Sequence, residues 1–127
     1  MNLKIVLKRL ILIDLLILFS AFVAVFFESE KSIQINESLP ELSNTYLFFA
    51  AFIVLSWLIS LYLLYKFKNF GKKLYLYVFI INIFYPFFGG IWVADPIIYV
   101  IDGLSWACGA SILTLIYFSP IKKEFKN

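Results

Sequence analysis

Four long apolar segments, separated by short polar or charged stretches, set the pattern of the chain. They cover residues 10–27, 44–65, 74–94 and 96–118. Each is close to the roughly 20 residues that an α-helix needs to cross the hydrocarbon core of a bilayer. With their short connections they use almost the whole chain, so no separate soluble domain fits. The sequence therefore predicts an all-α integral membrane protein, a four-helix transmembrane bundle that forms one domain over residues 1–127.

Residues typical of helix ends mark where two of these helices begin. Ser38-Leu-Pro-Glu41 has the form of a capping box with proline in the first turn, so the second helix is expected to start as early as Leu39. Asp95-Pro96 predicts an N-cap followed by the first residue of the fourth helix. Ser119-Pro120 predicts the end of that helix, because the residue before a proline disfavours the α conformation.

Pro86 lies inside the third apolar segment, and Gly89 and Gly90 follow it. Proline lacks the backbone N–H that continues a helix, so this segment is expected to kink or unwind in its second half. Transporters use such breaks near binding sites, but proline is also common in ordinary membrane helices. The kink alone therefore does not separate a structural role from a functional one.

The basic residues predict the orientation of the chain. The N-terminal tail, the loop Lys66–Lys73 and the C-terminal tail carry 3, 4 and 3 of the 11 Lys and Arg residues. The two other connections carry only Lys31 among basic residues, against four glutamates and Asp95. Because basic loops stay in the cytoplasm, we expect up-down topology with both termini cytoplasmic.

Composition supports the membrane prediction and excludes several function classes. Hydrophobic residues make up 63% of the chain, against about 45–50% in a soluble domain, and the mean hydropathy is +0.93. With no histidine and one cysteine, an internal disulfide is impossible and His/Cys metal or haem sites are not expected. Topology accounts for the net charge of +3, so nucleic-acid binding is not expected. No nucleophile–base pair or phosphate loop is visible, which favours a non-enzymatic protein without cofactors.

Asp14 is the most informative polar residue. An aspartate at the centre of a span costs about 2.5–3.5 kcal/mol on insertion scales, so it should face protein or water. At 1.5 Å per residue it lies roughly 6–14 Å from the cytoplasmic face. Ser56, Ser60, Asn82 and Ser111 fall at a similar depth, which predicts a polar layer around Asp14. Three roles stay open for this layer: fixing helix packing, holding a proton or cation, and contacting a partner protein.

The fourth apolar segment carries a second acid and a run of small residues. Asp102 lies two turns after Asp95, so it either forms an outward-facing acidic vestibule with Asp95 or reaches solvent or a helix end. Gly103, Ala107 and Ser111 repeat at i, i+4 spacing, which favours close helix packing. Cys108 falls on a different, more apolar face and is interpreted as a small apolar filler.

Two functions are compatible with these patterns. The first is a non-enzymatic interaction, accessory or immunity-type protein that binds a membrane-protein partner, or a second copy, in the bilayer. The alternative is a small oligomeric transporter or channel that uses Asp14 and Asp102 as a proton or cation site. The layout is similar to that of small multidrug-resistance transporters, but no motif around Asp14 matches them. The Lys/Asn/Ile/Phe-rich composition is typical of an AT-rich genome and indicates a bacterial source. With the predicted spans, we therefore expect a multi-pass protein of the inner (plasma) membrane.

Overall fold

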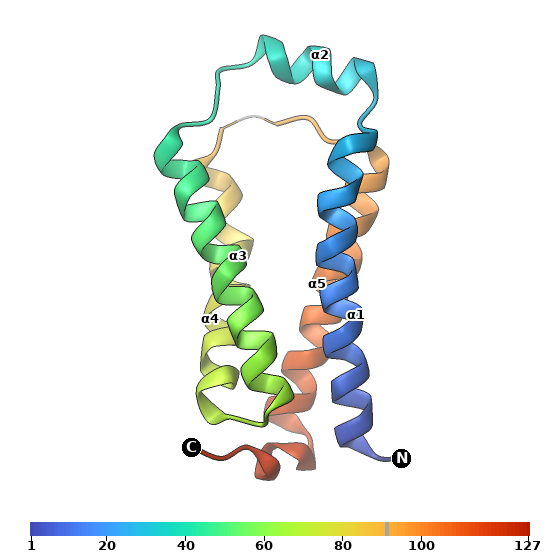
Figure 1. The fold of residues 1–127 in the computed structure, drawn as a ribbon, viewed down its shortest axis with the longest axis vertical. Coiled ribbons are helices and arrows are strands. Elements are labelled where there is room, and N and C mark those ends of the chain that lie inside the picture. The colour runs from blue at the N-terminus through green and yellow to red at the C-terminus, as the bar shows by residue number, and fades with distance from the viewer. Residues whose placement is uncertain (91) are drawn as a thin grey trace.

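The computed structural model describes residues 1–90 and 92–127, and its regular secondary structure is helical (Figure 1). The all-α prediction is therefore confirmed for the described part of the chain. Its elements are the α-helices α1 (Leu3–Ala24), α2 (Glu30–Ser38), α3 (Asn44–Tyr65), α4 (Asn69–Phe84) and α5 (Pro96–Phe118), and the 3₁₀ segments η1 (Val25–Phe27), η2 (Tyr85–Phe88) and η3 (Pro120–Glu124).

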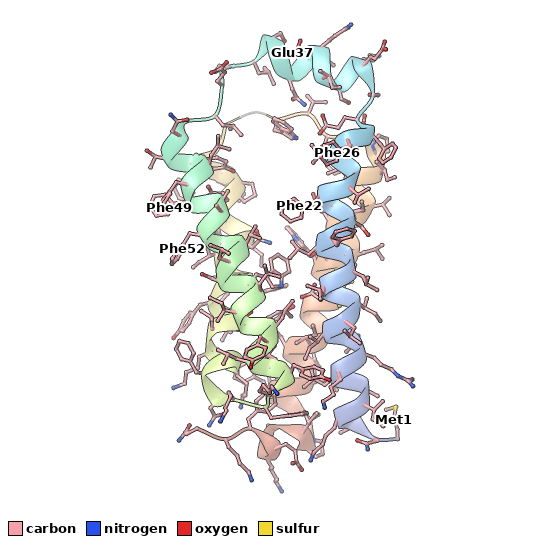
Figure 2. The ribbon with its side chains drawn as sticks, viewed as in Figure 1. Met1, Phe22, Phe26, Glu37, Phe49 and Phe52 are labelled. Carbon is pink, nitrogen blue, oxygen red and sulfur yellow. The ribbon has the colours of Figure 1, made fainter. Side chains whose placement is uncertain are left out.

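Three of these helices are long and apolar enough to cross a membrane: α1 continued by η1, α3, and α5. Only 17–22% of the most apolar window of each is buried inside the protein. Large apolar side chains such as Phe22, Phe49 and Phe52 are more than half exposed (Figure 2). Soluble proteins rarely leave so much contiguous apolar surface in water, so these surfaces are consistent with a membrane protein.

The second long helix starts later than the capping-box pattern predicted. Ser38 is the last residue of the short helix α2, and its hydroxyl donates to the Ile35 carbonyl. The N-cap of α3 is Ser43, whose hydroxyl oxygen accepts a hydrogen bond from the Tyr46 backbone N–H at 3.1 Å. Either serine has a side chain suited to capping a helix. Because the polar stretch between 28 and 38 forms a helix of its own, Ser38 ends that helix and Ser43 caps α3.

The third long helix is shifted from the predicted 74–94. It begins at Asn69, because Gly71 allows the first turn of α4 to lie directly against α3: a Cβ there would be 2.7 Å from the Leu63 Cβ. It ends at Phe84, and the chain continues as η2 through Pro86. Proline cannot donate the next helical hydrogen bond, so the predicted break ends the α-helix instead of merely kinking it.

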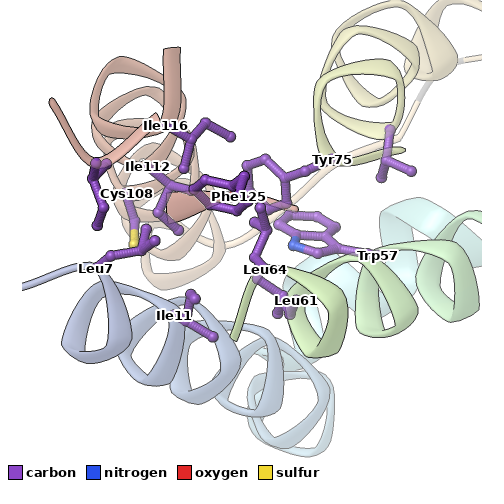
Figure 3. Packing of buried hydrophobic residues seen from close by; sticks show 12 residues of the cluster. Leu7, Ile11, Trp57, Leu61, Leu64, Tyr75, Cys108, Ile112, Ile116 and Phe125 are labelled. Atoms are coloured by element: carbon purple, nitrogen blue, oxygen red, sulfur yellow. The ribbon is translucent and has the colours of Figure 1, made fainter. Parts of the chain in front are cut away.

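The long helices form two pairs, α1 with α5 and α3 with α4 (Figure 1). The pairs meet near the chain termini and separate toward α2, which bridges them at the other end. We call the first part the terminal half (residues 3–14, 57–78 and 108–127) and the second the α2 half (residues 15–56, 79–90 and 92–107). The buried apolar cluster lies almost wholly in the terminal half (Figure 3) and includes Leu7, Ile11, Leu61, Leu64, Tyr75, Val78, Ile112, Ile116 and Phe125.

Candidate functional site

Asp14 lies at the centre of the terminal half and is fully buried. Its Oδ2 accepts two hydrogen bonds of 2.9 Å, one from Trp57 Nε1 on α3 and one from the Tyr75 hydroxyl on α4. Its Oδ1 has no hydrogen-bond partner in the part of the chain that the structure describes. One carboxyl group on α1 therefore links both helices of the other pair. We call these three residues the Asp14 lock.

The residues of the lock lie on the buried stripe of each helix. Asp14 follows Leu7 and Ile11 at helical spacing, and Tyr75 is followed one turn later by Val78. Trp57 is followed one turn later by the next buried residues of α3, Ser60 and Leu61. Tryptophan and tyrosine suit this position because each combines a large apolar ring with one donor that needs a partner when buried. Figure 3 shows Trp57 and Tyr75 within the apolar cluster.

Helix α5 closes the remaining side of the lock. The Cys108 thiol is buried and donates to the Leu10 carbonyl at 3.4 Å, which is a contact between α5 and α1. Gly109 lies so close to α4 that an added Cβ would be 2.6 Å from the Phe79 ring. Cys108 thus occupies a buried packing position, in agreement with its interpretation as a small apolar filler.

The donors predicted for Asp14 are wrong. Ser111 is exposed and donates to the Ala107 carbonyl of its own helix. Ser56 and Asn82 are half-buried, and neither donates to Asp14. Ser60 is buried, but its hydroxyl donates to the Trp57 carbonyl. The sequence did contain a signal for Trp57, because a tryptophan in the middle of a span lies outside the interfacial belt where this residue is enriched.

A cavity of about 230 Å³ lies between the two helix pairs in the α2 half. It brings together Asn82 from α4, which was expected in the layer around Asp14, with Asp102 and Ser105 from α5. Trp57 lines the cavity as well as donating to Asp14, so its ring separates the lock from the cavity. The full lining is Ile17, Leu18, Ala21, Ala50, Ile53, Val54, Trp57, Asn82, Tyr85, Ile101, Asp102, Ser105 and Trp106.

The small-residue stripe of α5 does not pack against the other helices of the described chain. Gly103, Ala107 and Ser111 are all exposed, and a Cβ added at Gly103 would meet nothing within 4 Å. The close packing within the chain is instead provided by Gly71 and Gly109. The stripe therefore faces the surroundings of the protein.

Asp95 does not share a vestibule with Asp102. It occupies the N-cap position of α5, but its carboxylate accepts hydrogen bonds from the Ser29 N–H (2.7 Å), the Ser29 hydroxyl (2.8 Å) and the Ser32 hydroxyl (2.6 Å) at the start of α2. These bonds hold the pKa of Asp95 below its usual value, with the Ser32 hydroxyl as the largest contribution. The Asn36 side chain exchanges two hydrogen bonds with the Val93 backbone. Helix α2 is therefore attached to the segment before α5.

The chain has no match among protein-family models, curated proteins or solved structures. Among residues 1–90 and 92–127, no group of three or more Cys, Asp and Glu side chains is placed to hold a metal ion. The Asp14 lock and the cavity beside it are thus the features from which a function has to be argued.

Proposed function

We propose that the chain is a multi-pass protein of the bacterial inner membrane with four spans and both termini in the cytoplasm. The fourth span would be α4 together with η2. From Leu74, after the basic loop, the α-helical residues to Phe84 rise about 16 Å and the four 3₁₀ residues about 8 Å, which makes this span shorter than the roughly 30 Å of a bilayer core. The lysine distribution supports this orientation, because all clusters of basic residues lie in the terminal half.

Within that membrane, the protein acts as a non-enzymatic interaction, accessory or immunity-type protein that binds a helix of a partner. The observation that carries this proposal is the cavity between the helix pairs, where Asp102 is exposed on a membrane-spanning helix. A carboxyl group at that depth needs a polar or basic partner. A partner helix with a Lys, Arg or amide side chain at the depth of Asp102 would supply one.

The Asp14 lock supports a structural role for the other acid. Both donors of the lock come from the same chain, and the carboxyl group is buried with no exposed surface. In this proposal the lock holds the two helix pairs together in the terminal half. The α2 half is then left free to receive the partner.

Site-specific photo-crosslinking in cells tests the proposal. A photoreactive amino acid at Ala50 or Ile101, which line the cavity, should give one protein adduct of defined mass. The same group at Ile59, exposed on α3 in the terminal half, is the matched control and should give none. Asp102→Asn should weaken the adduct from both cavity positions. Adducts to lipid alone at all three positions would contradict the proposal.

The alternative is a small oligomeric transporter or channel for protons or cations. It is favoured by one specific observation: Asp102, Asn82 and Ser105 supply oxygen ligands around the cavity, and Trp57 connects its wall to Asp14. Cation flux into liposomes that contain only the purified protein would support it. That flux should disappear in Asp102→Asn and Asp14→Asn while both variants stay folded. If purified protein in liposomes shows no flux, the alternative fails.

A further inference from the structure

A basic pocket of about 280 Å³ lies at the terminal end of the molecule, away from the Asp14 lock and the cavity. Its lining comes from three parts of the sequence: the first turn of α1, the connection between α3 and α4, and the C-terminal tail. The lining residues are Lys4, Lys66, Phe67, Lys68, Glu124 and Lys126. Four lysines and one glutamate thus line one small space.

The backbone fixes this arrangement. The Lys126 N–H donates to the Phe67 carbonyl at 2.9 Å, and the Asn69 N–H donates to the Lys126 carbonyl at 2.8 Å. These bonds form a parallel bridge between Lys68 and Lys126. Phe67 has a φ of +56°, a conformation that non-glycine residues seldom adopt. The tail is therefore attached to the α3–α4 connection by backbone hydrogen bonds, and the lysines are brought together by the fold.

An aromatic contact reinforces the same arrangement. The buried ring of Phe125 lies 5.4 Å from the Phe67 ring, measured between centroids. The Lys4 and Lys8 ammonium groups lie 5.8 Å and 5.9 Å from the centroid of the Phe67 ring. Cation–π attraction at such distances is favourable, so Phe67 attracts lysines from α1 toward the pocket.

The positive charge of the pocket is only partly neutralised within the chain. Glu124 pairs with Lys4 at 2.8 Å. In the part of the chain that the structure describes, Lys66, Lys68 and Lys126 form no ion pair. Like charges held close together repel, so a fold that fixes these three lysines around one space favours an anion there.

We propose that this pocket binds the phosphate of an anionic phospholipid headgroup. The pocket lies at the end of membrane-spanning helices, where headgroups are found, and basic pockets between such helices bind anionic lipids. Apolar side chains are also exposed on α1 and α3, the helices that contribute to the pocket or lead into it, among them Ile5, Leu12 and Tyr62, and they offer a surface for acyl chains. The inference rests on the proposed membrane embedding, and it does not depend on a protein partner.

Lipid binding by the purified full-length chain tests this proposal. Delipidated protein is titrated in detergent with phosphatidylglycerol, phosphatidylcholine or inorganic phosphate, and bound species are counted by native mass spectrometry. We expect one tightly bound phosphatidylglycerol and no comparable binding of phosphatidylcholine. Inorganic phosphate that binds as tightly as the lipid would show that the ligand is a free anion, and would overturn the proposal.

Two triple variants with the same loss of charge distinguish lipid binding in the pocket from a general effect of the positive charge. The pocket variant is Lys66→Gln/Lys68→Gln/Lys126→Gln. The control is Lys73→Gln/Lys122→Gln/Lys123→Gln, in which the three lysines are exposed and do not line the pocket. The pocket variant should bind phosphatidylglycerol at least about tenfold more weakly than the control, since each lysine near an anionic headgroup contributes to the binding free energy.

A third variant is the control for loss of binding through misfolding. Lys66→Arg/Lys68→Arg/Lys126→Arg keeps the charge and should retain binding, whereas loss of binding in this variant would contradict a site that depends on charge. Equal weakening in the pocket variant and its control would show that the charge acts diffusely, and would also overturn the proposal. The proposed protein partner is judged separately, by crosslinking from the cavity.

Discussion

The acidic side chains of the two halves have opposite environments. In the terminal half the helix pairs meet, and Asp14 receives donors from both helices of the opposite pair. In the α2 half, contacts hold the two helices of a pair to each other. Tyr46 stacks on Tyr85 between α3 and α4, with centroids 4.4 Å apart, and Asp95 attaches the start of α2 to the start of α5. Asp102 is left beside a cavity.

This contrast indicates what a polar residue in a membrane helix contributes. Where the donors come from the same chain, the residue fixes the packing of that chain. Where the chain leaves the residue at a cavity, the residue is available to something outside the chain. The comparison fits the proposal that the terminal half provides stability and the α2 half recognition, and four predictions test it.

The largest effect is expected for Asp14→Ala. Removal of the carboxyl group leaves the Trp57 N–H and the Tyr75 hydroxyl buried without an acceptor, which costs about 2–4 kcal/mol of unfolding free energy. Asp14→Asn keeps an acceptor oxygen and should retain most of the stability. Thermal unfolding of the detergent-solubilised variants measures both. Equal stability of Asp14→Ala and the wild type would show that the lock does not hold the pairs together.

Two glycine substitutions compare the halves directly. Gly71→Ala places a Cβ 2.9 Å from the Leu64 backbone nitrogen, which cannot move without shifting α3, so we expect a loss of about 1–3 kcal/mol. Gly103→Ala meets no atom within 4 Å and gains about 1 kcal/mol of helix propensity, so it should be neutral or stabilising. Unfolding in detergent gives both values. If Gly103→Ala instead reduces the apparent mass in detergent, the exposed stripe joins copies of the chain.

A smaller effect is expected for Tyr75→Phe, which removes one donor from Asp14 and leaves the ring in the buried cluster. Interhelical hydrogen bonds in membrane proteins average about 0.6 kcal/mol, so the loss should be about 1 kcal/mol or less. A double-mutant cycle with Asp14→Ala tests the contact, because once the acceptor is gone Tyr75→Phe removes an unpaired buried hydroxyl and should cost nothing or regain stability. Additive losses would show that the hydroxyl stabilises the fold by another route.

The smallest effect concerns the attachment of α2 and depends on pH. The pKa of Asp95 in the folded protein is below its usual value of 3.8, so its ionised carboxylate stabilises the docked α2 above that pH. The contribution is lost as the pH falls below 3.8 and through the folded pKa. The protection factors of the α2 amides, which are exchange rates corrected for the intrinsic pH dependence of amide exchange, should therefore fall at acid pH in the wild type. Asp95→Asn should remove this pH dependence of α2 protection, while the protection of the α4 amides stays unchanged.

The helical class and the bounds of α5 could be predicted from the sequence alone, whereas for α3 the apolar run was right and the capping-box start at Leu39 was wrong. The apolar segments at 44–65 and 96–118 coincide with α3 and α5, because hydrophobic run length and the stop at Ser119-Pro120 are local properties. Burial of Asp14 was also predictable, since an aspartate facing lipid is costly. The end of α4 was less predictable, because a proline permits either a kink or a stop.

The side chains that donate to Asp14 could not be predicted from the sequence, because they depend on the tertiary packing. Ser56 and Trp57 are neighbours in sequence and lie at nearly the same depth, but successive residues on an α-helix point about 100° apart. Depth can be counted along a sequence, whereas the rotation of each helix depends on how all of its neighbours pack. The close approach at Gly71 and the separation of the helix pairs toward α2 set that rotation, and so Trp57 reaches the carboxyl group and Ser56 does not.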